Sequence, residues 1–363
     1  MDIDPIHSDP ALVVEGFVHV GSPFSEFKLS YTRSLHHAGE SNLPRQASVV
    51  LEGENGSSYP STLSSYKTYM IHHPSLSHDQ KYRLVIEADG HRYESDFVEV
   101  KRSPEISELT WEQNENGVNI LVSTEDPTQQ SRYYRWEYEE TWRYGSAFVS
   151  SIILDNNEVR LRTLDELINL CYISDRSSAI LVATSKDLAV DAIHRFPVLL
   201  IPNLSEKLSH RYSVLVRQIP VTESAYRYWE QVRESSENLG DLFAPLPSDI
   251  QSNFVCVTDP NRSVIGWAEV AEVAEKRIFI DRNDTVEFWP HQDDFYASCM
   301  IVEETIQQAL IDIRNNPGFL LVNEIMNNPA SPYPTHYTYA SRRCVDCRVK
   351  GGTLERPLYW IDK

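Results

Sequence analysis

The clearest alternation of hydrophobic and polar positions lies in residues 211–238, where a strand pattern passes directly into a helix pattern. Apolar or aromatic residues occupy every second position from Tyr212 to Val216, the period expected of a half-buried strand. Pro220 ends this alternation, and Thr222 follows as a suitable N-cap. Apolar positions then recur at helical spacing, so the pattern predicts a helix near residues 222–238.

The first hundred residues contain short alternating segments separated by turn pairs. Asn55-Gly56 and Asp89-Gly90 tolerate positive φ and favour tight hairpins. No long amphipathic helix interrupts these segments, so the pattern predicts an immunoglobulin-like or transthyretin-like β-sandwich over residues 11–102. Residues 1–10 are polar and rich in Asp and Pro, and we expect them to form a tether.

A larger β-rich, fibronectin-like domain is predicted over residues 105–363. Its most regular strand is RYYRWEYEETWRY, residues 132–144, in which mostly aromatic even positions alternate with mostly charged odd positions. This alternation is typical of a sandwich strand with one buried and one solvated face. A second helix is predicted near residues 303–315, and an irregular tail with cysteines closes the chain. The predicted fold class is mainly β, with two β-sandwich domains and two inserted helices.

Composition narrows the classes of partner. The 363 residues suffice for two domains, and 41% hydrophobic residues suit a packed globular protein. A formal net charge of −20 argues against nucleic acid, because binding phosphates requires clustered Lys and Arg. No apolar run approaches the roughly 20 residues of a membrane span.

The five cysteines are sparse, and the CVDC motif at 344–347 is the sharpest local pattern. As half a zinc site it lacks a second CxxC or an HxxxH pair at suitable spacing. As a c-type haem attachment it fails, because Arg348 stands in place of the required His. Disulfides that pin the tail are the preferred interpretation, provided that the compartment is oxidising. The candidate disulfide cysteines are Cys256, Cys299, Cys344 and Cys347. Cys256 and Cys299 are the preferred partners for the two cysteines of the motif, and Cys171 is left over.

The aromatic face of residues 132–144 offers Trp136, Tyr138 and Trp142 as a platform for a carbohydrate or a peptide. The regular alternation with charges favours packing in the sandwich core instead. The sequence contains no GxSxG, P-loop, GxGxxG or HExxH motif. We therefore predict no catalytic, cofactor or metal residues, and a protein that is not an enzyme.

Several stretches occur together, in the same order, in one known family. They are Ser8-Asp9-Pro10 before Leu12-Val13-Val14-Glu15-Gly16, the joint from Tyr212 to Trp229, Val264-Ile265-Gly266 followed by residues 276–280, and CVDCR at 344–348 with Gly351-Gly352-Thr353. On this ordered set the chain resembles the Bacteroidota outer-membrane lipoproteins catalogued as "domain of unknown function 4249". One departure is Pro357-Leu358-Tyr359-Trp360, where the family usually ends in Pro-Asp-Phe-Trp; this changes a packing detail only.

The resemblance implies a compartment and a partner. Members carry a lipoprotein signal peptide whose acylated cysteine lies just before the Asp/Pro-rich start, so this chain would be the mature part of a cell-surface lipoprotein. Their genes commonly accompany SusC-type TonB-dependent transporters, so an outer-membrane β-barrel of that type is the expected partner. The resemblance therefore implies a non-enzymatic accessory subunit that helps to capture or gate a substrate. A structural or adhesive β-sandwich module, or a surface glycan or peptide hydrolase, are the alternatives.

Overall fold

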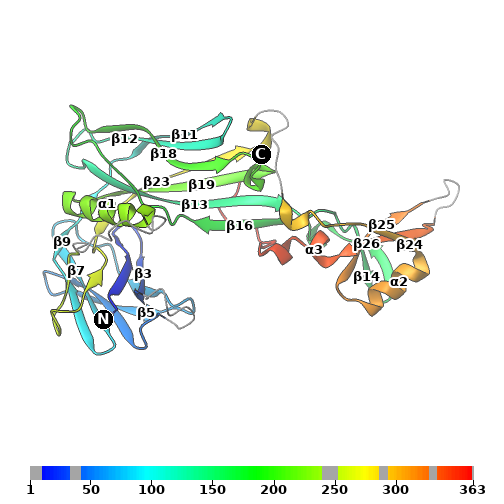
Figure 1. The fold of residues 1–363 in the computed structure, drawn as a ribbon, viewed down its shortest axis with the longest axis horizontal. Helices are drawn as coiled ribbons and strands as arrows, with labels where there is room; N and C mark the ends of the chain where they lie inside the picture. The colour runs from blue at the N-terminus through cyan, green and yellow to red at the C-terminus, as the bar shows by residue number, and fades with distance from the viewer. Residues whose placement is uncertain (1–9, 33–41, 239–251, 286–292, 327–332, 362–363) are drawn as a thin grey trace, which may run out of the picture.

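The computed structural model describes residues 10–32, 42–238, 252–285, 293–326 and 333–361 (Figure 1). These residues form two β-sandwiches and a small α/β lobe, and the predicted mainly β fold class is confirmed. Figure 1 shows the lobe at the far end of the molecule from the two sandwiches. No helix within the described ranges is long and apolar enough to cross a membrane.

The N-terminal sandwich is one curled sheet that encloses a core of alternate apolar residues such as Leu29, Leu51 and Leu84. Its strands, in spatial order, are β20 (Phe254–Cys256), β8 (His91–Ser95), β7 (Lys81–Ala88), β4 (Ala47–Gly53), β5 (Ser58–Leu63), β6 (Tyr69–His72), β3 (Phe24–Tyr31), β1 (Leu12–Gly16) and β21 (Val264–Ile265), with β9 (Val98–Glu99) paired to β7.

Two strands of this sandwich come from far along the chain. β21 pairs in parallel with β1, with Leu12 beside Val264, and β20 pairs antiparallel with β8. The predicted boundary, which placed all of residues 105–363 in the second domain, therefore needs correction. Strands of two and three residues have no periodicity of their own, and they bury apolar side chains in the first core. A small sheet of β2 (Val18–His19), β22 (Val270–Glu272) and β10 (Lys101–Arg102) then connects the two sandwiches.

The second sandwich consists of two facing sheets. Its first sheet contains β11 (Ile106–Asn114), β12 (Gly117–Glu125) and β18 (Ala192–Pro202). Its second sheet contains β16 (Leu170–Arg176), β13 (Tyr133–Gly145), β19 (Arg211–Pro220) and β23 (Ala274–Asp281), with β17 (Leu181–Thr184) paired to β13. The two sheets enclose Ile120, Trp136 and Val214, among others.

The predicted strand–helix joint is confirmed. β19 leads into α1 (Glu223–Asn238), and Thr222 Oγ1 accepts a hydrogen bond of 3.1 Å from the amide of Ala225, as an N-cap does. Short 3₁₀ helices connect other elements: η1 (Leu164–Glu166), η2 (Glu206–Leu208), η3 (Arg282–Asp284), η4 (Asp294–Tyr296) and η5 (Cys347–Lys350).

The small lobe was not foreseen as a separate part, because two distant segments build it. The hairpin of β14 (Ile152–Asp155) and β15 (Glu158–Leu161) is inserted between β13 and β16. The remaining elements follow β23: β24 (Val302–Thr305), α2 (Ile306–Asn315), β25 (Phe319–Ile325), β26 (His336–Ser341) and α3 (Arg342–Val345). The helix predicted near 303–315 exists but begins at residue 306, because residues 302–305 pair with β26 as a strand.

Two disulfides hold the tail. Cys299 is bonded to Cys344 inside the lobe, and Cys171 at the start of β16 is bonded to Cys347. The expected bridges to the CVDC motif are confirmed, but the assignments of Cys256 and Cys171 need correction. Cys256 is a free thiol that is 3% exposed in the N-terminal core, because β20 carries it into that sandwich.

Candidate functional site

A cleft of about 650 Å³ lies between the two sandwiches. The N-terminal sandwich contributes one wall through β1, β2, β3 and the turn between β2 and β3. The second sandwich contributes the other wall through β13, β16, β19 and β23. Binding sites occur preferentially at such domain interfaces, so this cleft is the candidate functional site.

The wall from the second sandwich is a ladder of charged side chains on neighbouring strands. Arg217 Nε of β19 lies 2.6 Å from Glu275 Oε1 of β23. Guanidinium nitrogens of Arg217 and Arg277 each lie 3.9 Å from a carboxylate oxygen of Glu139 on β13. Of the charged positions predicted for residues 132–144, Glu137 lines the cleft, whereas Arg135 is buried.

Arg176 at the end of β16 connects the two walls. Its Nη1 lies 3.5 Å from Glu26 Oε2 of β3, and its Nε lies 3.5 Å from Glu139 Oε2 of β13. Arg176 is 70% exposed, so these ion pairs are accessible to solvent and individually weak. A charged or polar ligand can exchange with them at little cost, which suits a reversible binding site.

Ser25, which lines the cleft, forms a buried pair with His73. Ser25 Oγ lies 2.8 Å from His73 Nε2, and His73 Nδ1 lies 3.1 Å from the carbonyl oxygen of Pro74. A carbonyl only accepts, so Nδ1 carries the proton and Nε2 accepts from Ser25. A serine hydroxyl that donates to a histidine is also the arrangement of a catalytic nucleophile and its general base. However, Ser25 is only 2% exposed and also accepts a 3.0 Å hydrogen bond from the amide of His19, so the pair braces the turn between β2 and β3.

The histidines at this wall predict a dependence of stability on pH. Burial lowers the pKa of both His19 and His73. The unfolded chain therefore binds protons that the folded chain does not. The folded state loses stability relative to the unfolded chain as the pH falls below about 6.5. We expect the free energy of unfolding to fall by up to about 1.4 kcal/mol per pH unit for each histidine in its window.

Denaturant titrations at several pH values test this dependence. His73→Gln should show a shallower fall between about pH 6.5 and 5 than the unchanged chain. His194→Gln is the control, since His194 is exposed on β18. Equal slopes for the two variants would contradict the prediction.

A buried ion cluster joins the two sandwiches behind the cleft. Arg135 of β13 lies 2.8 Å from Glu269 and 2.5 Å from Glu137, and its side chain is 8% exposed. Burial lowers the pKa of Arg135, but the carboxylates of Glu269 and Glu137 more than compensate, so its pKa is raised above the ordinary value. Trp229 of α1 donates from Nε1 to Glu269 at 2.6 Å, and Arg135 lies over its ring at 4.6 Å. One cluster thus holds β13, α1 and the returning segment near residue 269.

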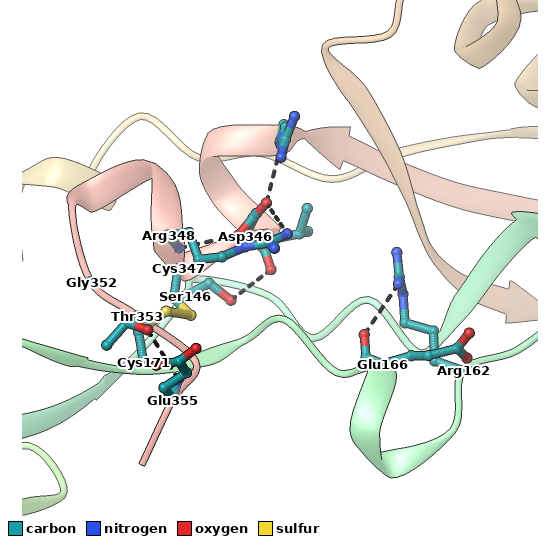
Figure 2. Close-up of polar contacts among 12 residues, drawn as sticks. Ser146, Arg162, Glu166, Cys171, Asp346, Cys347, Arg348, Gly352, Thr353 and Glu355 are labelled. Atoms are coloured by element: carbon teal, nitrogen blue, oxygen red, sulfur yellow. Dashed lines mark hydrogen bonds and ion pairs between the residues drawn. A yellow bond between two sulfur atoms is a disulfide. The ribbon is translucent and has the colours of Figure 1, made fainter. Parts of the chain in front are cut away.

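The CVDCR motif forms the junction between the lobe and the second sandwich (Figure 2). Asp346 is completely buried and accepts hydrogen bonds from Arg348 Nε at 2.8 Å and Arg342 Nε at 3.1 Å. Burial raises the pKa of Asp346, and these hydrogen bonds outweigh it, so the pKa is lowered overall. Figure 2 shows the Cys171–Cys347 bridge beside this carboxylate. The motif therefore has a structural role, because it fixes the lobe to the second sandwich.

Gly352 is required by close packing in this junction. A Cβ atom there would lie 2.4 Å from Tyr144 Oη and 2.9 Å from Cys171 Cβ. Tyr144 cannot move freely, because its hydroxyl donates to the Cys347 carbonyl at 2.6 Å. We expect Gly352→Ala to lower the free energy of unfolding by about 1–3 kcal/mol, measured by denaturant unfolding. Gly21→Ala, whose Cβ would meet no atom closer than 3.6 Å, should change it little, and equal losses would contradict the argument.

The structure separates the three aromatic candidates. Trp136 and Trp142 are 0% and 7% exposed and belong to the core of the second sandwich, whereas Tyr138 is partly exposed and lines the cleft. The cleft itself was missed from the sequence, although the charged odd positions of β13 were its available signal. In the described part of the chain, no cluster of three or more His, Cys, Asp or Glu side chains has the arrangement of a metal site.

Fold and site together define a multidomain β-sandwich protein with an interdomain cleft and a disulfide-braced lobe. The family model described as "Domain of unknown function (DUF4249)" matches residues 1–277, and the chain belongs to this family. No curated protein matches the chain. Among solved structures, a two-domain fibronectin type III segment of chicken tenascin is similar over 59% of this chain and 92% of its own, with 10% identity and a TM-score of 0.15. A TM-score this low carries no argument about function.

Proposed function

We propose that this protein is a non-enzymatic accessory lipoprotein of the outer membrane that docks on a SusC-type TonB-dependent transporter. The observation that carries the proposal is the pair of disulfides at the base of the lobe, Cys171–Cys347 and Cys299–Cys344. Such bridges persist in oxidising compartments such as the bacterial envelope and cell surface, and are rare in the cytosol. Membership of the family supports the same compartment through the resemblance described above.

The arrangement of parts suits an accessory subunit. The cleft offers polar and charged side chains from two domains, and the weak ion pairs of Arg176 allow reversible capture of a polar substrate. The lobe projects from the sandwiches and is held rigidly at its base, which suits a docking element (Figure 1). We therefore assign substrate capture to the cleft and partner docking to the lobe.

Affinity purification of the tagged, lipidated protein from its own outer membrane, followed by mass spectrometry, tests the proposal. We expect a TonB-dependent β-barrel in stoichiometric amount. An unrelated outer-membrane lipoprotein with the same tag is the control. A clean preparation without any barrel would overturn the proposal and favour the adhesive module instead.

A further inference from the structure

The small sheet of the lobe has one covered edge and one open edge. On the β25 side, the amide of Ser151 donates to the carbonyl of Val322 at 2.8 Å, and Ser150 Oγ donates to the carbonyl of Leu321 at 2.5 Å. On the other side, β24 pairs with β26 and, within the described ranges, with no further strand. Figure 1 shows this sheet at the outer end of the molecule.

Exposed apolar residues lie where the open edge begins. Met300, Ile301 and Val302, which lead into and begin β24, are 76%, 45% and 37% exposed. An exposed edge strand presents unpaired backbone N–H and C=O groups and is a template for pairing with another chain. Natural proteins protect such edges by keeping them short or charged, and β24 has four residues, two of them glutamates. The exposed apolar residues at its start are the part that a pairing strand from a partner would cover.

The edge is also held in place at both ends. Cys299, directly before Met300, is bonded to Cys344 of α3. At the other end, Thr305 caps α2 by accepting a 3.4 Å hydrogen bond from the amide of Gln308, and α2 packs through Ala309 into the lobe core. A strand that is already rigid in its binding conformation loses little entropy when a partner pairs with it.

We propose that β24 accepts an extended segment of the partner protein as an additional strand, and that this segment carries Lys or Arg side chains between apolar ones. The inference rests on the proposed function and specifies how the partner docks. Main-chain hydrogen bonds to the free edge would supply affinity, and the alternate side chains would supply specificity.

Charge identifies the kind of occupant. Glu303 and Glu304 lie on β24, and neither forms an ion pair with any residue that the structure describes. A partner strand with cationic side chains would pair with both carboxylates, whereas an acidic strand would be repelled. A second copy of this chain fits poorly, because antiparallel pairing of two β24 edges sets these glutamates opposite or beside one another, in chains that each carry a net charge of −20.

Hydrogen exchange on the complex purified from native membranes tests the pairing. We expect the amides of residues 301–304 to exchange more slowly in the complex than in the isolated chain, while those of β25 remain unchanged. If a barrel co-purifies but exchange in β24 is the same in both samples, the edge proposal is wrong and the proposed function stands. If no barrel co-purifies, the proposed function fails, and the edge proposal fails with it.

A pair of charge reversals tests the chemistry of the occupant. Glu303→Lys with Glu304→Lys should reduce recovery of the partner at least about tenfold. Glu158→Lys with Asp165→Lys makes the same change in net charge at exposed positions elsewhere on the lobe, and should leave recovery nearly unchanged. Thermal melting and intact disulfides in both variants establish that the lobe is folded. Equal recovery from both variants, or increased self-association instead of partner loss, would overturn the assignment of a cationic strand.

Discussion

Replacing Cys171 and Cys347 together by serine is expected to lower the free energy of unfolding by about 5 kcal/mol. The bridge closes a loop across a sequence separation of 176 residues, so its loss releases a large conformational entropy in the unfolded chain. It also frees the tail, in which Trp360 packs edge-on against Tyr172 at 5.0 Å. Guanidinium unfolding followed by tryptophan fluorescence measures both effects.

Cys256→Ala is the matched control for the disulfide variant. Cys256 is a buried cysteine without a bridge, so its replacement should cost about 1 kcal/mol. The junction would be less important than the structure indicates if the double serine variant unfolded at the same denaturant concentration as this control. The same conclusion would follow if full reduction of the unchanged chain left its denaturant midpoint of unfolding where it was.

Arg135→Met is expected to lower the free energy of unfolding by about 3–5 kcal/mol, because it leaves the buried carboxylate of Glu269 without its cation. The contacts between the two sandwiches should be weakened most, since Glu269 belongs to the returning segment and Arg135 to β13. Limited proteolysis should then separate the sandwiches at lower denaturant concentrations than in the unchanged chain.

Two further variants isolate the ionic part of this loss. Adding Glu269→Gln to Arg135→Met removes the uncompensated charge while leaving an oxygen that can accept from Trp229, so part of the stability should return. Lys186→Met breaks the exposed pair with Glu223, whose distance of 2.7 Å is close to the 2.8 Å between Arg135 and Glu269, and should change the free energy of unfolding little. Similar losses for Arg135→Met and Lys186→Met would refute a special role for burial.

Local patterns predicted those parts of the fold that local interactions determine. The joint at β19 and α1 was predictable because alternation, the proline at 220 and the Thr222 cap all lie within a few residues of one another. The aromatic and charged faces of β13 were predictable for the same reason. In both cases the chemistry of consecutive residues and the tertiary environment agree.

Long-range pairing was not predictable from these patterns. β21 has only two residues, and nothing in its own sequence shows that Val264 lies beside Leu12. The lobe combines segments around residues 152 and 321, and the bridge of Cys171 depends on a tail that returns to β16. The cleft was missed for the same physical reason. The charges on β13 were evident, but the second wall is formed by β1 to β3 of another domain.

The return of the chain to its first sandwich also sets an order of assembly. Until residues 254–265 have been synthesised, β1 and β8 lack their outer partners, and the pocket for Phe254 remains open. During synthesis the chain therefore carries an incomplete sandwich with two unpaired strand edges until these residues are made. Its first domain is completed late, which makes residues 11–102 a poor fragment to express alone.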